Sequence, residues 1–226
     1  PLYSAKLVLN LSNNELHRLL LIALILLILN SLNSILNYIT LKLNVKFSSV
    51  IYLNIEKDIK IKYIELDNEL VTLDNVIKSI TPNTKVISLA HITNVIGDER
   101  PIKEITDYAH KHNILVVLDA AQSAPHVKID VENLGVDFMG FSGHKMCGPT
   151  GIGVLYGKYE LLNKLNPQNV GGGMNNDFES NMTYRYKELP YRLEAGTPNI
   201  EGVIGLGSAI DYINSIGINN IENYVS

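Results

Sequence analysis

Hydrophobic and polar positions follow two alternating periods from Val50 onward. Short runs rich in β-branched residues are separated by stretches of about 10 to 15 residues in which apolar positions recur with helical spacing. Strands that alternate with helices in this way are typical of βαβ units, in which helices cover a parallel sheet. The pattern therefore predicts an α/β fold with a mostly parallel sheet flanked by helices.

The individual elements follow from the same pattern. The predicted strands are 61–66, 85–90, 114–118, 136–141 and 154–156, and the predicted helices are 73–80, 102–112, 203–213 and 218–224. The apolar run 114–118 is typical of a strand that is buried on both faces. Asp119 follows that run, at the carboxyl end of a strand, which is where open α/β sheets bind ligands.

Residues 1–49 have a different pattern. Leu19–Leu29 is an unbroken apolar run, and no charged residue lies between Arg18 and Lys42. The uncharged stretch Leu19–Leu41 is long enough for a membrane helix, which needs about 20 apolar residues. The Asn and Ser side chains within it would be costly near the middle of a bilayer. We therefore expect an atypical apolar, Asn-rich segment that is an insertion or a gene-model artefact, and a membrane anchor stays as an alternative.

Composition and charge narrow the function classes. Of the 226 residues, 46% are hydrophobic, which is enough for a sizeable core. The net charge is −4 and no basic run occurs, so we do not expect nucleic-acid binding. A single cysteine and the lack of a Cys/His cluster predict neither a disulfide nor a metal site, and indicate an intracellular protein.

Lys145 is the strongest candidate for a catalytic residue, because it follows a predicted strand and lies between Gly143 and Gly148. An enzyme that uses pyridoxal phosphate needs a lysine for the cofactor's aldehyde and a carboxylate for its ring nitrogen, and Asp119 could supply the second. Singly, each residue has an ordinary explanation, as a surface lysine or a helix N-cap. The stretch 148–153 lacks the spacing of a nucleotide loop, and Cys147 within the same region is expected to be a small packing residue.

Several longer motifs together resemble the class V aminotransferase family, and within it the type II cysteine desulfurases and selenocysteine lyases. The matching stretches are 90–97, 118–126, 137–145, 148–157 and 192–199, with a looser match at 171–174. The resemblance extends from about residue 61 to residue 225. It implies the large domain of a fold-type I, pyridoxal-phosphate-dependent transferase, formed by residues 50–226 and truncated at both ends.

The same resemblance implies an activity and its partners. A homodimeric enzyme would take sulfur from L-cysteine, or selenium from L-selenocysteine, release L-alanine, and pass sulfur to an acceptor protein for iron–sulfur cluster assembly. Carried over by position, Lys145 would hold the cofactor's aldehyde, Asp119 would pair with its ring nitrogen, and Gln122 would contact its phenolic oxygen. Ser142 and His144 would bind the phosphate. Asn94 would lie near the ring or the substrate, and Thr197 would reach the phosphate of the neighbouring subunit.

The chain also departs from the family. The family's persulfide-forming cysteine and a substrate-binding arginine lie in a C-terminal small domain, and the chain stops before both. We therefore interpret the chain as a central fragment. Three alternatives stay open: another class V reaction, such as a transaminase or a kynureninase-like lyase; a truncated cofactor-binding fragment without activity; and a membrane-anchored protein. Cytoplasm, plastid-type organelle and mitochondrion are all compatible compartments.

Overall fold

The computed structural model describes residues 60–178 and 184–225. Residues 63–226 form one compact unit. The expectations for residues 1–49, including the apolar run Leu19–Leu29, lie outside the described residues. Within the described part of the chain, no helix has the length and apolar character needed to cross a membrane.

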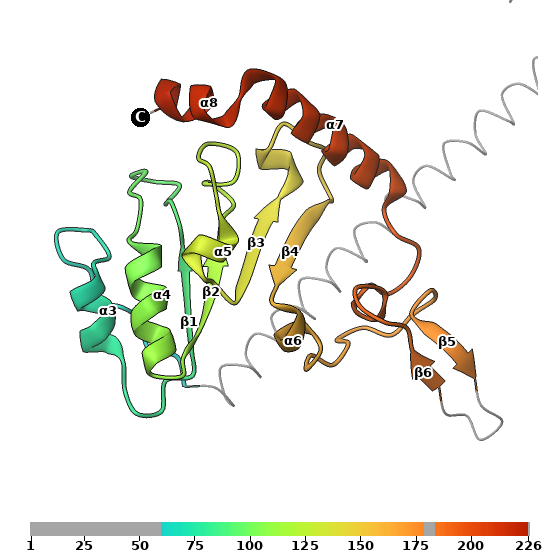
Figure 1. The fold of residues 1–226 in the computed structure, drawn as a ribbon, viewed down its shortest axis with the longest axis horizontal. Helices are drawn as coiled ribbons and strands as arrows, with labels where there is room; N and C mark the ends of the chain where they lie inside the picture. Colours follow the sequence, from blue (N-terminus) through green and yellow to red (C-terminus); the bar gives the residue numbers. More distant parts are fainter. Residues whose placement is uncertain (1–59, 179–183, 226) are drawn as a thin grey trace, which may run out of the picture. The chain divides into compact units, whose positions relative to one another are not determined.

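A four-stranded sheet forms the centre of the fold, in the order β1-β2-β3-β4 (Figure 1). Its strands are β1 (Val86–Ala90), β2 (Leu115–Asp119), β3 (Phe138–Ser142) and β4 (Gly153–Gly157). The first three are parallel, and β4 runs antiparallel to β3. The predicted α/β fold with a mostly parallel sheet is confirmed.

The helices and the remaining strands surround this sheet. The helices are α3 (Leu73–Ser79), α4 (Ile102–Lys111), α5 (Val131–Leu134), α6 (Tyr159–Leu162), α7 (Ile200–Ile216) and α8 (Ile218–Val225), with 3-10 turns η1 (Gly143–Lys145) and η2 (Tyr191–Leu193). A separate antiparallel hairpin pairs β5 (Asn175–Phe178) with β6 (Tyr184–Tyr186). The sequence pattern indicated neither the hairpin nor the short helices α5 and α6.

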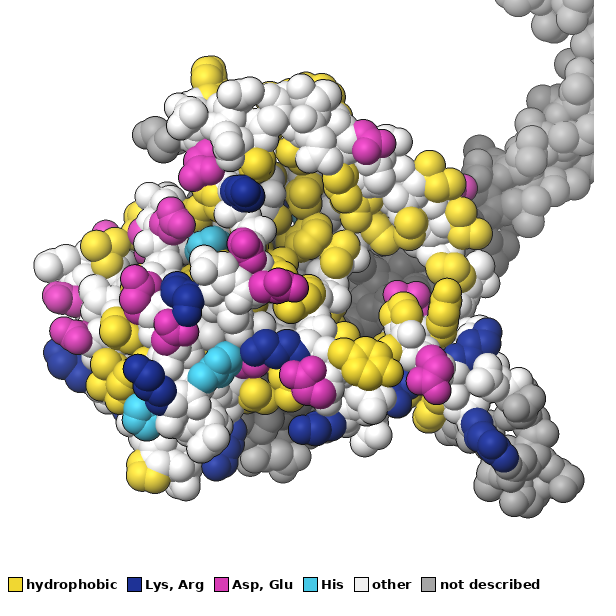
Figure 2. All heavy atoms as spheres, viewed as in Figure 1, with side chains coloured by type: hydrophobic (Ala, Val, Ile, Leu, Met, Phe, Trp, Pro, Cys, Tyr) yellow, Lys and Arg dark blue, Asp and Glu magenta, His cyan; other side chains and the backbone are white. Residues whose placement is uncertain are grey.

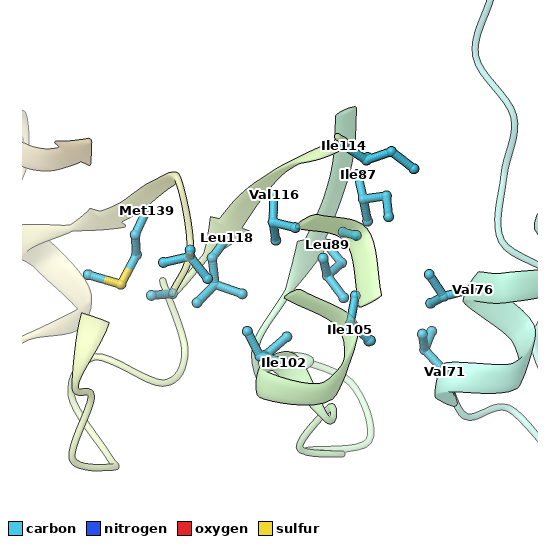
Figure 3. Packing of buried hydrophobic residues seen from close by; sticks show 13 residues of the cluster. Val71, Val76, Ile87, Leu89, Ile102, Ile105, Ile114, Val116, Leu118 and Met139 are labelled. Carbon is cyan, nitrogen blue, oxygen red and sulfur yellow. The ribbon is translucent and has the colours of Figure 1, made fainter. Parts of the chain in front are cut away.

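The core lies between helix α4 and one face of the sheet (Figure 3). Ile102 and Ile105 of α4 are buried with Leu89 of β1 and Leu118 of β2. Full burial of such a side chain stabilises the fold by about 1.5–3 kcal/mol. On the other face of β2, Leu115 and Val117 are only half-buried. The expectation of a strand buried on both faces is therefore only partly met.

A buried carboxylate ties the amino-terminal end of β3 to its neighbours. Asp137 has a side chain that is 4% exposed, and its Oδ1 accepts a hydrogen bond from Lys158 Nζ at 2.7 Å. Its Oδ2 accepts from His110 Nε2 at 2.9 Å and from the Val116 N–H at 2.7 Å. Burial alone would raise the pKa of Asp137, but these three donors outweigh it and lower the pKa. One ionised side chain thus joins β2, β3, α4 and the end of β4.

One predicted strand is wrong. Residues 61–66 alternate in polarity, yet they form no strand, and Ile61, Tyr63 and Leu66 are exposed. A tight turn follows, in which Asp67 and Leu70 exchange backbone hydrogen bonds and Asn68 has a φ of 48°. Alternation produces a strand only where a partner strand accepts its hydrogen bonds, and no described strand lies beside this segment.

We expect Asp137→Asn to lower the free energy of unfolding by about 2–3 kcal/mol, because Lys158 loses its anionic partner while its own side chain keeps some contact with solvent. Urea denaturation would measure this. Asp107→Asn, which removes the exposed pair between Asp107 and Lys103, is the matched control and should change stability far less. An equal loss in both variants would contradict the role given to Asp137.

The pH dependence follows with a definite sign. Because the folded pKa of Asp137 is lowered, its contribution is complete above the unfolded pKa, about 3.9, and is lost as the pH falls through the folded value. Unfolding free energies measured from pH 6 down to pH 2 should therefore fall less steeply in Asp137→Asn than in the wild type.

Candidate active site

The carboxyl ends of the parallel strands lie at one edge of the sheet. Ala90, Asp119 and Gly140 are aligned across β1, β2 and β3. Past this row, the His91 N–H donates to the Asp119 carbonyl at 2.9 Å and the Ala120 N–H to the Gly140 carbonyl at 2.9 Å. The loops that follow the three strands therefore start side by side.

Asp119 ends β2 with an exposed carboxylate. Its Oδ1 accepts a hydrogen bond from the Ala121 N–H at 2.9 Å, which fixes the side chain in an Asx turn. No helix starts here, so the residue is not a helix N-cap. Among the described residues, no lysine, arginine or histidine lies within ion-pair distance of it. The carboxylate is therefore oriented by the backbone and still able to pair with a cation.

Gln122 and Ser123 lie in the turn that follows β2. The Gln122 carbonyl accepts a hydrogen bond from His126 Nδ1 at 2.6 Å, while the Gln122 side-chain amide bonds to no described residue. The hydroxyl of Ser123 is fully buried and has no hydrogen-bond partner among the described residues. The turn is thus held by its backbone, and the Gln122 amide is available to a ligand.

Lys145 ends the 3-10 turn η1, which follows directly from β3. The Gly143 carbonyl accepts from the Met146 N–H at 2.9 Å and the Gly148 N–H at 3.0 Å, and the Gly143 N–H donates to the Ile152 carbonyl at 2.8 Å. Met146 is buried, whereas Lys145 and the preceding His144 are exposed. The loop backbone is closed on itself and anchored by Met146, with the lysine amine outside.

Cys147 differs from the prediction. It was expected to be a packing residue, but its side chain is exposed and its backbone has a φ of 58°. The buried residue at this point is its neighbour Met146, with 8% exposure. Because the chain turns back at Gly148 to bond with Gly143, only one of the two adjacent side chains can point into the core.

Asn94 lies in the loop after β1 and is exposed. That loop is closed by the Thr93 hydroxyl, which donates to the Asp98 carboxylate, and by the Thr93 N–H, which donates to the Asp98 carbonyl at 3.2 Å. His91 is buried at its base, where burial lowers the pKa of the imidazole and the nearby Glu99 carboxylate only partly opposes this. A neutral His91 therefore supports the loop that carries Asn94.

The segment 192–199 is attached to three separate parts of the chain. Arg192 Nη2 donates to the Leu162 carbonyl at 3.1 Å, at the end of α6. The Gly196 N–H donates to the Gly172 carbonyl at 2.9 Å, and Asn199 Nδ2 donates to the Gly151 carbonyl at 3.1 Å. Thr197 is exposed between the last two attachments.

The sequence-predicted residues therefore divide into two groups. The first consists of residues carried by the loops at the carboxyl edge of the sheet: Asn94, Asp119, Gln122, Ser142, His144 and Lys145. The second is Thr197 alone. It lies on the segment 192–199, which is joined to the loop after Lys145 by the hydrogen bond from Asn199 Nδ2 to the Gly151 carbonyl. Apart from Asp119, none of these side chains forms a hydrogen bond to another described residue. Together they comprise an amine, a carboxylate, hydroxyls, amides and an imidazole.

Sequence reasoning missed the residues that hold this site together. Asn199 and Arg192 appeared only as letters of a motif, although each makes a hydrogen bond to a carbonyl far away in the sequence. For Asn199 a signal was present: an asparagine directly before a helical pattern is a common N-cap. For Arg192 the sequence holds no local signal, because its partner carbonyls end a helix about thirty residues earlier.

Gly143→Ala tests the closed loop. A Cβ at Gly143 would lie 2.7 Å from Ile152 Cγ2 and 3.1 Å from the Ile152 carbonyl oxygen, so we expect a loss of about 1–3 kcal/mol in unfolding free energy. Gly207→Ala is the matched control, since nothing lies within 4 Å of its Cβ position on α7 and alanine favours a helix. Urea denaturation compares them, and equal stability would contradict the closed loop.

Comparison with known proteins agrees with this geometry. The model of the family described as aminotransferase class V matches residues 28–226. A probable cysteine desulfurase of Halalkalibacterium halodurans is 47% identical over 177 residues, which cover 78% of this chain and 41% of the relative. The chain thus spans about two fifths of that relative's length.

Two solved structures are similar as well. The cysteine desulfurase CsdA of Escherichia coli, in its S-sulfonic acid form, superposes with a TM-score of 0.70 at 37% identity, over 76% of this chain and 43% of CsdA. C-DES, a lysine-to-alanine variant with glycine covalently linked to its PLP cofactor, gives 0.58 at 27% identity, over 64% and 39%. The chain belongs to the class V aminotransferase family.

Proposed function

We propose that the protein that carries this chain is a pyridoxal-phosphate-dependent cysteine desulfurase. One observation carries the proposal: Lys145 and the backbone-oriented carboxylate of Asp119 lie at the same edge of the sheet, among polar side chains that bond to no described residue. The names of the relatives, which are cysteine desulfurases, support the choice of reaction within the family.

The donor set fits pyridoxal phosphate. The cofactor carries an aldehyde, a ring nitrogen, a phenolic oxygen and an anionic phosphate, which call for an amine, a carboxylate and hydrogen-bond donors. Lys145 and Asp119 supply the first two groups, and neither is occupied by an ion pair within the described chain. Gln122 would donate to the phenolic oxygen, and Ser142 and His144 to the phosphate. Pyridoxal phosphate, when bound, supplies an electron-accepting ring that stabilises negative charge on the substrate's α-carbon.

Three residues of the chain have separate roles in the proposed reaction. The Asp119 carboxylate would hold a proton on the ring nitrogen, and its Asx turn fixes its orientation. Lys145 Nζ would hold the aldehyde before substrate binds and, once the substrate's amine has replaced it there, would move the proton at the substrate's α-carbon. Asn94, on the neighbouring loop, would orient the bound ring or the substrate.

We propose L-cysteine as the substrate. In the net reaction its carbon–sulfur bond breaks, the sulfur atom joins an acceptor thiol as a persulfide, and the carbon skeleton leaves as L-alanine. The acceptor thiol's sulfur forms the new S–S bond, so atoms and electrons balance without a further oxidant. The relatives' names support this choice.

We also propose that the protein is a homodimer. Helix α7 exposes apolar side chains in its first turns, with Ile200 at 59%, Val203 at 56% and Ile204 at 67% exposure. Figure 2 shows hydrophobic side chains gathered along this helix, whereas acidic and basic side chains are intermixed over α3, α4 and α5. An apolar face of this kind is typical of a protein interface, and Thr197 lies directly before it in the chain.

Covalent labelling tests the cofactor site. The chain is mixed with pyridoxal phosphate, reduced with borohydride and mapped by peptide mass, and we expect the label on Lys145. Lys145→Ala should remove the label, whereas Lys164→Ala, which changes another exposed lysine, should keep it. Labelling at a different lysine, or none in a folded sample, would contradict the proposal.

Asp119→Asn separates binding from chemistry. The amide still fits the Asx turn, so we expect the Lys145 label to persist, while L-alanine release from L-cysteine falls about 100-fold or more, because an amide cannot hold the ring proton as a carboxylate does. An unchanged rate of L-alanine release would contradict the role of Asp119.

Light scattering tests the dimer. We expect twice the mass of one chain, and we expect Ile204→Glu to shift the mass toward that of a single chain because it places a charge in the apolar face. Tyr224→Glu, which alters an exposed aromatic on α8, is the control and should leave the mass unchanged. A wild-type protein with the mass of one chain would exclude the homodimer.

A further inference from the structure

The side-chain amide of Asn199 joins two parts of the molecule. Its Oδ1 accepts from the Gly202 N–H at 2.9 Å and caps helix α7, while its Nδ2 donates to the Gly151 carbonyl at 3.1 Å. We propose that Asn199 is a positioning residue that holds the loop of Lys145 in place by tying it to the first turn of α7. The inference rests on the proposed role of Lys145.

Backbone hydrogen bonds close the Lys145 loop at both of its ends, and at the second end the Gly143 N–H donates to the Ile152 carbonyl at 2.8 Å. Hydrogen bonds from Met146 and Gly148 to the Gly143 carbonyl close its first half. The second half passes through Gly151, whose φ is 76°, before the chain enters β4. Among the described residues, the Gly151 carbonyl accepts a hydrogen bond only from Asn199 Nδ2. This bond therefore adds a side-chain contact to the second half of the loop, next to the backbone bond at Ile152.

Helix α7 contacts the same loop beside that bond. A Cβ at Gly205 would lie 2.9 Å from Pro149 Cγ, and one at Gly148 would lie 3.3 Å from Leu206 Cδ1. Figure 1 shows α7 crossing the end of β3, from which the loop emerges. The absence of a Cβ at Gly202, where it would come 2.5 Å from Asn199 Nδ2, leaves room for the amide. The loop and the helix are thus packed closely enough for one short side chain to join them.

The Asn199 amide serves the two partners with two separate atoms, since the helix needs an acceptor and the Gly151 carbonyl needs a donor. Aspartate caps helices as well as asparagine does, and its charge is favourable at a helix N-terminus, but it would turn an oxygen toward the Gly151 carbonyl. Serine caps with a single hydroxyl and has no second group to reach the loop. Asn199→Asp and Asn199→Ser therefore keep the helix cap and remove the hydrogen bond to the Gly151 carbonyl. The aspartate variant adds a negative charge, and the serine variant adds none.

Amide hydrogen exchange of the full chain without cofactor tests the tie directly. We expect exchange at Gly143, whose N–H donates to the Ile152 carbonyl beside Gly151, to quicken roughly tenfold in both variants, as the loss of one hydrogen bond implies. Exchange at Leu206 in α7 should stay as in the wild type. Asn220→Asp is the matched control: it removes a similar bond, from Asn220 Nδ2 to the Ile216 carbonyl at 2.6 Å, far along the chain in α8.

A second measurement relates the hydrogen bond between Asn199 and Gly151 to Lys145. Titration of the chain with pyridoxal phosphate should give an apparent dissociation constant roughly tenfold higher in both Asn199 variants, with the wild-type value in Asn220→Asp. Wild-type exchange at Gly143 would overturn the inference, and so would equal acceleration throughout α7, which would mean that only the helix cap was lost. If the wild-type chain leaves Lys145 unlabelled, the proposed function fails, while the exchange data still decide whether Asn199 holds the loop.

Discussion

The parallel register of β1, β2 and β3 is the constraint on which the site depends. Ile87 and Leu89 of β1 and Val116 and Leu118 of β2 face α4 together, and a slip of one residue would move these side chains to the opposite face of the sheet. Burial of one face therefore fixes where each strand ends. Since Asp119 and the turn of Lys145 follow strand ends, the apolar core sets the geometry of polar groups that it does not contact.

The site is assembled from short loops, each fixed by its own backbone before any ligand is involved. Thr93 and Asp98 close the loop after β1, an Asx turn orients Asp119, and hydrogen bonds to the Gly143 carbonyl close the loop of Lys145. Apart from the Asp119 carboxylate, the functional side chains are thereby left without hydrogen-bond partners among the described residues. Such preorganisation is what binding of a polar cofactor requires, because no bonds within the protein have to be broken first.

Sequence reasoning predicted the elements with strong periodicity and the edge at which their loops meet, because β1, α4, β2 and β3 form through local patterns and a shared core. It failed for residues 61–66, since a strand also needs a partner that sequence alternation cannot reveal. It also missed the bonds of Arg192 and Asn199, which depend on which distant carbonyls come close after folding. The roles of the site residues and the sulfur-acceptor protein stay predictions from the resemblance, and the intracellular compartment stays a prediction from the cysteine content.

Asp137 lies just before β3 begins, whereas Lys145 lies just after it ends. The main buried ionic cluster and the reactive edge are therefore separated by the full length of one strand. Evolution, or a protein engineer, could alter the His110 and Lys158 contacts to tune tolerance of acid or heat without disturbing the reactive groups. The same separation lets the loops at the reactive edge diversify toward new substrates while the opposite edge continues to hold the strands together.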